Sequence, residues 1–365
     1  MDPLLCFSHL RWDFVFQRPQ HLMTRAALQR RVVYVEEPVV DGTHALDARQ
    51  SDRVTIVTPH VRASSTADPE ARSLLDLYLA RQPLARPVLW YYTPAAVPLT
   101  RHLAGGVTVY DCMDELSAFR GARADMRDLE RELLDRADLV FTGGQTLYEA
   151  KRGLHPSVRA FPSSVDTPHF ARARAGLEDP GDQRGIRRPR VGFFGVLDER
   201  LDQELLAGLA DARPAWQIVM VGPTVKIDPR ELPRRDNIHY RGQRAYADLP
   251  SYISGWDVAW LPFARNEATR FISPTKTLEY MAAGRPVVST SIQDVVRPYG
   301  AQGLVRIADT VDETVQAMEA SLREPAAGRV ARFDALLATR SWDATWDEMT
   351  RLISETAEAA GEEAA

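Results

Sequence analysis

A lysine in the second half of the chain stands where the sequence predicts the start of a helix. Ser273 is a favourable N-cap residue, and Pro274 suits the first helical position because its missing N–H is not needed there. Gly284 can take the left-handed conformation that ends a helix, so we expect a helix from Pro274 to about Ala283. Lys276 then lies in the first turn, where a cation opposes the helix dipole unless an anion is bound. The pattern indicates a phosphate-binding site.

The same stretch holds a carboxylate one turn further on. Glu279 lies on the helix face of Lys276, where it either accepts hydrogen bonds from ribose hydroxyls or forms an intrahelical ion pair with the lysine. Lysine is rare in this chain, because only Lys151, Lys226 and Lys276 occur among the 45 basic residues. A codon bias explains the preference for arginine, but a compact ammonium group at this position suits a phosphate.

The elements that must position these residues follow a regular alternation. Short apolar runs such as RRVVYVEEP and ADLVFTGG alternate with amphipathic stretches such as MRDLERELLDRA, and the alternation begins again at RVGFFGVL. This order is typical of parallel sheets with helices on both faces. We therefore predict an α/β protein with two doubly wound, Rossmann-like domains that face a cleft, and the carboxyl ends of the strands form the binding site.

Changes in composition suggest where the domains meet. The segment GLEDPGDQRGIRRPR is polar, charged and rich in Gly and Pro, which is typical of a connection between domains. We expect an N-terminal domain over 1–165, a linker over 166–190 and a C-terminal domain over 191–340. Residues 341–365 should form a C-terminal helix and a frayed acidic tail.

Composition excludes several classes of protein. The chain has 365 residues, of which 45% are hydrophobic, and a net charge of −5, which argues against a nucleic-acid partner. Two cysteines are too few for a disulfide scaffold or a Cys-rich zinc site. No secretory signal or membrane-spanning run is evident, so we expect a cytoplasmic protein. Peripheral contact with the inner face of the membrane would need a basic, aromatic face, for which the candidates are Trp12, Phe14, Arg18, Arg25, Arg30 and Arg31; an ordinary solvated surface is the alternative.

The stretch SPTKTLEYMAAGRPVV, residues 273–288, resembles the nucleotide-sugar signature of GT-B glycosyltransferases, in particular the family-4-like group. The resemblance extends through VGFFGVLDERLD (191–202), VMVGP (219–223), NIHYRGQRAYADLPSYI (237–253) and FPSSVDTPHF (161–170). It implies the GT-B fold, with an acceptor-binding domain over 1–165 and a nucleotide-sugar-binding domain over 191–340. It also implies a nucleoside diphosphate sugar as donor, with a UDP-sugar expected, and no cofactor. The donor-binding residues that it implies are Gly195, Arg200, Gly222, Arg241, Arg265, Ser273, Thr275, Lys276 and Glu279.

The chain departs from the retaining relatives at one position. Those enzymes carry two glutamates with seven residues between them, but the position that pairs with Glu279 is Phe271, and the nearest earlier acid is Glu267. The stretch VTVYDCMDELSAF, residues 107–119, is instead similar to inverting glucuronosyltransferases of xanthan assembly. In those relatives an aspartate acts as the base, and Asp114 matches it. The alternative for Asp114 is a helix N-cap.

A second candidate base is His21, at a helix start that follows the first strand. A structural histidine bonded to a carbonyl oxygen is the alternative. Arg18, beside it, and Asp111, at the end of another strand, are the expected acceptor-binding residues. The chain lacks an Asp-x-Asp motif, and GT-B enzymes as a class generally need no bound metal, so metal-independent transfer is expected.

These observations predict a glycosyltransferase that moves a sugar to a hydroxyl group of a glycan, a lipid-linked molecule or a small molecule. Two alternatives stay open. One is a nucleotide-sugar epimerase of the same fold, and the other is a non-catalytic scaffold that binds glycans or nucleotides.

Overall fold

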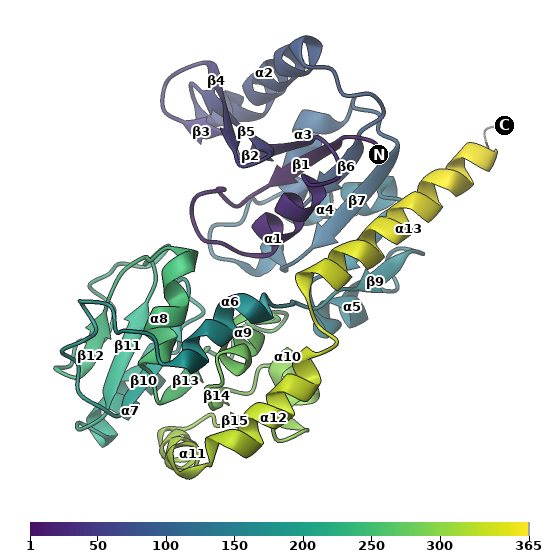
Figure 1. Cartoon of the computed structure of the whole chain (residues 1–365). Helices are drawn as coiled ribbons and strands as arrows, with labels where there is room; N and C mark the ends of the chain where they lie inside the picture. The colour runs from purple at the N-terminus through teal and green to yellow at the C-terminus, as the bar shows by residue number, and fades with distance from the viewer. Residues whose placement is uncertain (364–365) are drawn as a thin grey trace. The chain divides into compact units, whose positions relative to one another are not determined.

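The computed structural model describes residues 1–363, which form two compact units (Figure 1). The first unit contains Met1–Pro162 together with the chain from Trp342 onward, and the second contains Ser163–Ser341. In both units helices alternate with the strands of a mainly parallel sheet, so the predicted α/β class with two Rossmann-like units is confirmed. No described helix is long and apolar enough to cross a membrane.

The sheet of the first unit has the order β3-β5-β2-β1-β6-β7-β8-β9, and β4 pairs with β5 in the antiparallel sense. The central strands are apolar and buried along their length, as expected where helices cover both faces of a parallel sheet. Their bounds are β1 (Leu4–Ser8), β2 (Val32–Glu36), β3 (Val39–Val40), β4 (Ala45–Ser51), β5 (Val54–Val61), β6 (Val88–Tyr91), β7 (Val107–Cys112), β8 (Leu139–Thr142) and β9 (Val158–Ala160).

The helices of the first unit include one that follows the second unit in the chain. Their bounds are α1 (Arg18–Ala26), α2 (Ala67–Arg81), α3 (Val97–Thr100), α4 (Met126–Arg136), α5 (Gln145–Lys151) and α13 (Trp342–Glu363). The helix α13, yellow in Figure 1, packs against α1 and β7. Its buried residues, which join the core of the first unit, are Trp342, Trp346, Met349 and Ile353.

The expected frayed tail is wrong for most of its length. The helix α13 continues to Glu363, and residues 364–365 lie outside the described part of the chain. Packing of its first turns supplies the costly nucleus of the helix, and alanine and glutamate, which favour helix, then extend it into solvent.

The second unit has the strand order β12-β11-β10-β13-β14-β15, and its strand pairs are parallel. The chain thus moves outward in one direction from β10 to β12 and then returns to the other side of β10 with β13. This reversal is the switch point at which doubly wound sheets bind ligands. The strand bounds are β10 (Arg190–Phe194), β11 (Gln217–Val221), β12 (Ile238–Tyr240), β13 (Val258–Leu261), β14 (Val287–Ser289) and β15 (Val305–Ile307).

The helices of the second unit include a short one just before its sheet begins. Their bounds are α6 (Thr167–Ala171), α7 (Gln203–Ala212), α8 (Leu249–Ser254), α9 (Lys276–Ala282), α10 (Gln293–Val295), α11 (Val311–Arg323) and α12 (Ala326–Leu337). The helix α6 packs against α9 and α8.

The expected linker 166–190 belongs to the second unit instead of connecting two domains. Gln183 in this segment is buried, and its amide donates to the carbonyl oxygen of Tyr252 (3.0 Å) and accepts from the indole of Trp256 (2.9 Å). Arg190 pairs with Asp179 at 2.7 Å. The composition suggested a solvated connection because it is polar, but these polar groups bond to the second unit.

Candidate functional site

The main chains at the ends of β10 and β11 are in direct contact. Gly195 and Gly222 have φ angles of 142° and 147°, which side chains disfavour. A Cβ atom on Gly222 would lie 1.8 Å from the carbonyl oxygen of Gly195, so only glycine fits there. The amide of Gly195 donates to the carbonyl oxygen of Val221 at 2.8 Å. The two strand ends therefore form one surface of main chain, in which Gly195 is partly exposed and Gly222 is buried.

The side chain of Lys276 lies over this surface. A Cβ atom on Gly195 would lie 2.1 Å from Cε of Lys276 and 3.0 Å from its Nζ. The ammonium group is 5.9 Å from the centre of the Phe194 ring. Three of the predicted donor residues, Gly195, Gly222 and Lys276, are thus brought together at the switch point of the sheet. An ammonium group next to the main chain of a glycine is an arrangement that can hold a diphosphate.

The predicted start of the helix is wrong by two residues. The helix α9 begins at Lys276, and Thr275 occupies the cap position without a side-chain cap. Ser273 lies two residues before the cap position. Its carbonyl oxygen accepts from Oγ of Ser163 at 2.9 Å, and Oγ1 of Thr275 donates to the same hydroxyl at 3.2 Å. Lys276 still lies in the first turn. Ser163, which holds this segment, was missed because it is over a hundred residues away in the chain.

Glu279 lies on α9 with a carboxyl group that is almost fully buried. Burial raises its pKa from 4.5 to about 7, although the charge of Lys276 acts in the opposite direction and that of Asp166 adds to the rise. The carboxyl group therefore changes its charge near neutral pH. Glu267, the nearest earlier acid, is exposed and lies 3.8 Å from Arg270.

Of the three arginines predicted for the donor site, Arg200 and Arg265 each have a local carboxylate partner. Arg200, which follows β10, donates to Asp198 through Nη2 (2.6 Å) and Nε (3.0 Å). Arg265 is exposed and pairs with Asp309 at 3.2 Å. Arg241 follows β12, and its amide donates to the carbonyl oxygen of Met220 at 2.9 Å. Asp198, buried beside Arg200, was missed by sequence reasoning, although its spacing of two residues from the arginine is a usable signal.

In the first unit, Asp114 lies in the turn after β7 and is partly exposed. Its carbonyl oxygen accepts from Sγ of Cys112 at 3.5 Å. The alternative interpretation of Asp114 as a helix cap is wrong, because Glu115 precedes the short helical turn Leu116–Ala118. A partly exposed carboxylate at the carboxyl end of a parallel strand is placed where such sheets bind their ligands.

Arg18 and Asp111 form a buried pair with each other. The guanidinium donates to both carboxylate oxygens of Asp111, from Nε at 2.9 and 3.1 Å and from Nη2 at 2.8 Å. It also donates from Nη1 to the carbonyl oxygen of Phe161 at 2.7 Å. Asp111 is fully buried and Arg18 is 2% exposed, so the pair belongs to the core of the first unit and not to the expected acceptor site.

His21 is enclosed by aromatic rings. Its ring stacks on that of Trp342, with centres 4.7 Å apart, and the Phe16 ring meets it edge-on at the same distance. The side chain is buried. This packing supports the structural alternative for His21 and not a role as the base.

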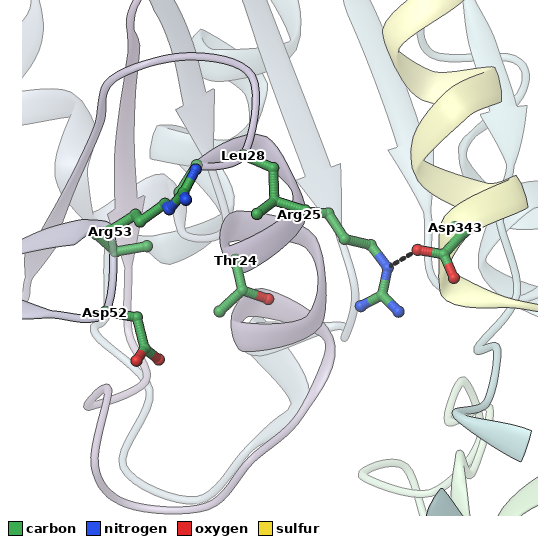
Figure 2. A pocket seen from close by; sticks show the side chains of 8 residues that line it. Thr24, Arg25, Leu28, Asp52, Arg53 and Asp343 are labelled. Atoms are coloured by element: carbon green, nitrogen blue, oxygen red, sulfur yellow. Dashed lines mark hydrogen bonds and ion pairs between the residues drawn. The ribbon is translucent and has the colours of Figure 1, made fainter. Parts of the chain in front are cut away.

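A hollow of about 350 Å³ lies in the first unit near the start of β5 (Figure 2). Arg25 crosses its edge and pairs with Asp343 of α13 at 2.7 Å. The expected basic, aromatic face is not formed as a set, because Trp12 is buried and donates to Ser51 at 3.0 Å, and Arg18 is buried as well. The residues that line the hollow are Thr24, Arg25, Ala27, Leu28, Asp52, Arg53, Val54 and Asp343.

Comparison with known proteins agrees with this geometry. Residues 188–324 match the family model described as glycosyl transferases group 1, and this range contains Gly195, Gly222 and Lys276. The matched range includes the switch point described above. The resemblance to GT-B glycosyltransferases predicted from the sequence is confirmed.

A curated relative of this chain is TuaH of Bacillus subtilis (strain 168), named for glycosyl transfer in teichuronic acid biosynthesis. The two are 25% identical over 220 residues, which cover 56% of this chain and 55% of TuaH, so the match spans about half the length of each.

Solved structures show the same fold. Sucrose-phosphate synthase from Thermosynechococcus elongatus has a TM-score of 0.73 at 16% identity and covers 98% of this chain and 100% of its own. A trehalose-6-phosphate protein from E. coli, bound with UDP-2-fluoro glucose, has a TM-score of 0.70 at 12% identity, with 97% and 99% covered. HepE from Anabaena, in complex with UDP and glucose, has a TM-score of 0.66 at 14% identity, with 97% and 100% covered.

Proposed function

We propose that this protein transfers a sugar from a nucleoside diphosphate sugar, with UDP as the nucleotide, to a hydroxyl group of an acceptor. The observation that carries the proposal is the position of Lys276 over Gly195 at the switch point of the second unit. A diphosphate can approach the end of β10, where Gly195 bears no side chain, and the ammonium group offsets the negative charge of the diphosphate. The UDP ligands named for two proteins of the same fold support the choice of uracil as the nucleobase of the donor.

In this mechanism Lys276 stabilises the negative charge that develops on the departing diphosphate, a contribution that acts mainly in the transition state. Gly195 lets the side chain of Lys276 lie against the main chain at the end of β10, and Gly222 lets the end of β11 lie against Gly195. Glu279, when ionised, accepts hydrogen bonds from the ribose hydroxyls. Because its pKa lies near 7, the strength of this contact depends on pH.

For the transfer step we assign the general base to Asp114, which removes the proton of the acceptor hydroxyl as the new C–O bond forms. The partly exposed position of this carboxylate after β7 supports the assignment, whereas His21 is packed between rings. A single displacement with this base inverts the anomeric carbon, so an α-linked donor gives a β-linked product. Proton NMR of the product distinguishes the two outcomes, and an α-product would rule out this mechanism.

Two further features belong to the proposal. Transfer is metal-independent, since Lys276 takes the place of a divalent cation on the diphosphate, and we therefore expect turnover to persist in EDTA. The acceptor is a hydroxyl group of a cell-envelope glycan or of its lipid-linked precursor, a choice that the name of TuaH supports.

The experiment that tests the function is a thermal-shift screen of the full chain against UDP-, GDP- and ADP-sugars, because a bound donor raises the melting temperature. The best donor is then incubated without acceptor and the products are analysed. We expect slow hydrolysis to the free sugar and UDP. Conversion to an epimer, with the diphosphate bond intact, would favour the epimerase alternative, and binding without any product would favour the scaffold.

A further inference from the structure

One of the three lysines of the chain is buried next to the turn that bears Asp114. Lys151, the last residue of α5, has a side chain that is 6% exposed. Its Nζ lies 2.7 Å from Oε2 of Glu115 and 2.7 Å from Oε2 of Glu130 on α4. Burial disfavours the charge, but the surrounding acidic groups raise the pKa of Lys151, so the ammonium stays protonated at neutral pH. It joins two carboxylates that would otherwise repel each other.

Glu115 connects this lysine to the turn after β7. It directly follows Asp114, and its Oε1 accepts from Oγ of Ser117 at 2.7 Å while Oε2 faces Lys151. Through this side chain the ammonium holds the main chain on the C-terminal side of Asp114. A hydrogen bond from Sγ of Cys112 to the carbonyl oxygen of Asp114 closes the turn.

The other side of the turn rests on Gly143, which lies between β8 and α5. A Cβ atom there would lie 2.7 Å from the carbonyl oxygen of Met113 and 2.8 Å from its Cα. The amide of Gly143 donates to the carbonyl oxygen of Cys112 at 2.8 Å. One short segment, 143–151, therefore holds the turn through a main-chain contact at one end and an ion pair at the other.

We propose that Lys151 is a positioning residue that fixes Asp114 for proton removal by holding Glu115. The inference rests on the proposed role of Asp114 as the base. A base acts only within hydrogen-bond reach of the proton that it removes, and a displacement of about 1 Å can lower a rate about 10²-fold. Without the ammonium, the carboxylates of Glu115 and Glu130 repel each other, and Glu115 moves toward solvent together with the turn.

The test compares variants of the full chain in kcat, in UDP affinity and in melting temperature. We expect Lys151→Met and Glu115→Gln to lower kcat by about 10- to 100-fold with UDP affinity unchanged. Lys151→Arg, which keeps the charge, should restore part of the loss. The matched control is Tyr110→Phe, which removes the 2.8 Å hydrogen bond from Tyr110 to Glu130 at the other side of the same cluster. It should lower the melting temperature and keep kcat within about twofold.

A purely structural role for Lys151 would lower the melting temperature of these variants and leave kcat per folded molecule unchanged, which would overturn the inference. If Lys151→Met does not fold, the kcat values of Glu115→Gln and Gly143→Ala test the inference. Glu115→Gln leaves Lys151 paired with Glu130, and Gly143→Ala displaces Met113 directly. Wild-type kcat in both would overturn the inference. Asp114→Asn is measured beside them, because normal turnover there means that the base is misassigned, whatever Lys151 does.

Discussion

Two basic residues in this protein each begin a helix near a proline, and they have opposite surroundings. Arg18 begins α1 in the first unit and is buried against Asp111, which projects from β7. Lys276 begins α9 in the second unit, is partly exposed, and lies over the main chain of Gly195. The first cation pairs with a carboxylate of a neighbouring strand, and the second lies against a glycine at a strand end.

The difference teaches that a cation at a helix start predicts a site for an anion only when the adjacent strand end supplies no carboxylate. Around Arg18 the protein itself provides the anion, and the guanidinium becomes part of the core. Around Lys276 the adjacent strand β10 ends next to Gly195, and the carboxyl group that opposes its charge is Glu279 on the same helix, whose pKa is raised to about 7. The positions of the two cations look alike in the sequence, but one is arginine and the other lysine, and their partners differ.

The largest effect that we predict from this comparison is the loss of stability when the buried pair of Arg18 and Asp111 is broken. Asp111→Ala leaves the buried Arg18 without its counter-charge and should lower the free energy of unfolding by about 3–5 kcal/mol. Urea unfolding measures the change. The control is Asp343→Ala, which breaks the more exposed pair with Arg25 and should cost about 1 kcal/mol or less. Equal losses in the two variants would mean that Arg18 is not a core residue.

The second prediction concerns ligand binding by the other cation. Lys276→Ala should weaken UDP binding by about 10- to 100-fold, as expected for the loss of a hydrogen bond between charged groups, and leave the melting temperature nearly unchanged. Isothermal titration with UDP measures the affinity. Arg323→Ala, which removes an exposed cation of α11, serves as the control and should bind UDP normally. A Lys276→Ala protein with wild-type affinity would remove the lysine from the site.

The third prediction is a dependence of stability on pH. Because the pKa of Glu279 is raised to about 7 in the folded state, folded protein holds this proton more tightly than unfolded protein does. The free energy of unfolding should therefore decline by about 3 kcal/mol in total as pH rises from about 4.5 through 7, and this contribution should level off at about pH 8. Glu279→Gln should lack this part of the decline. An equal change in the free energy of unfolding between pH 5 and pH 8 in the wild type and in Glu279→Gln would contradict the assignment.

Local features of the sequence predicted the fold and the centre of the site. The alternation of apolar runs and helical stretches indicated the parallel sheets, and the glycines and the lysine indicated the surface at the end of β10. The partners of charged residues were not predictable, because the carboxylate that pairs with Arg18 is 93 residues away. The same reason explains the errors at Ser273, which a distant hydroxyl engages, and at 166–190, whose polar groups bond to the second unit.

The position of α13 has a consequence for how the protein is made. Its buried tryptophans complete the core of the first unit, yet they follow the whole of the second unit in the chain. A ribosome therefore releases residues 163–341 before it makes the residues that cover the sheet of the first unit. The second unit can fold while the first still exposes apolar surface, so the half that is synthesised first is the half that finishes last and depends longest on chaperones.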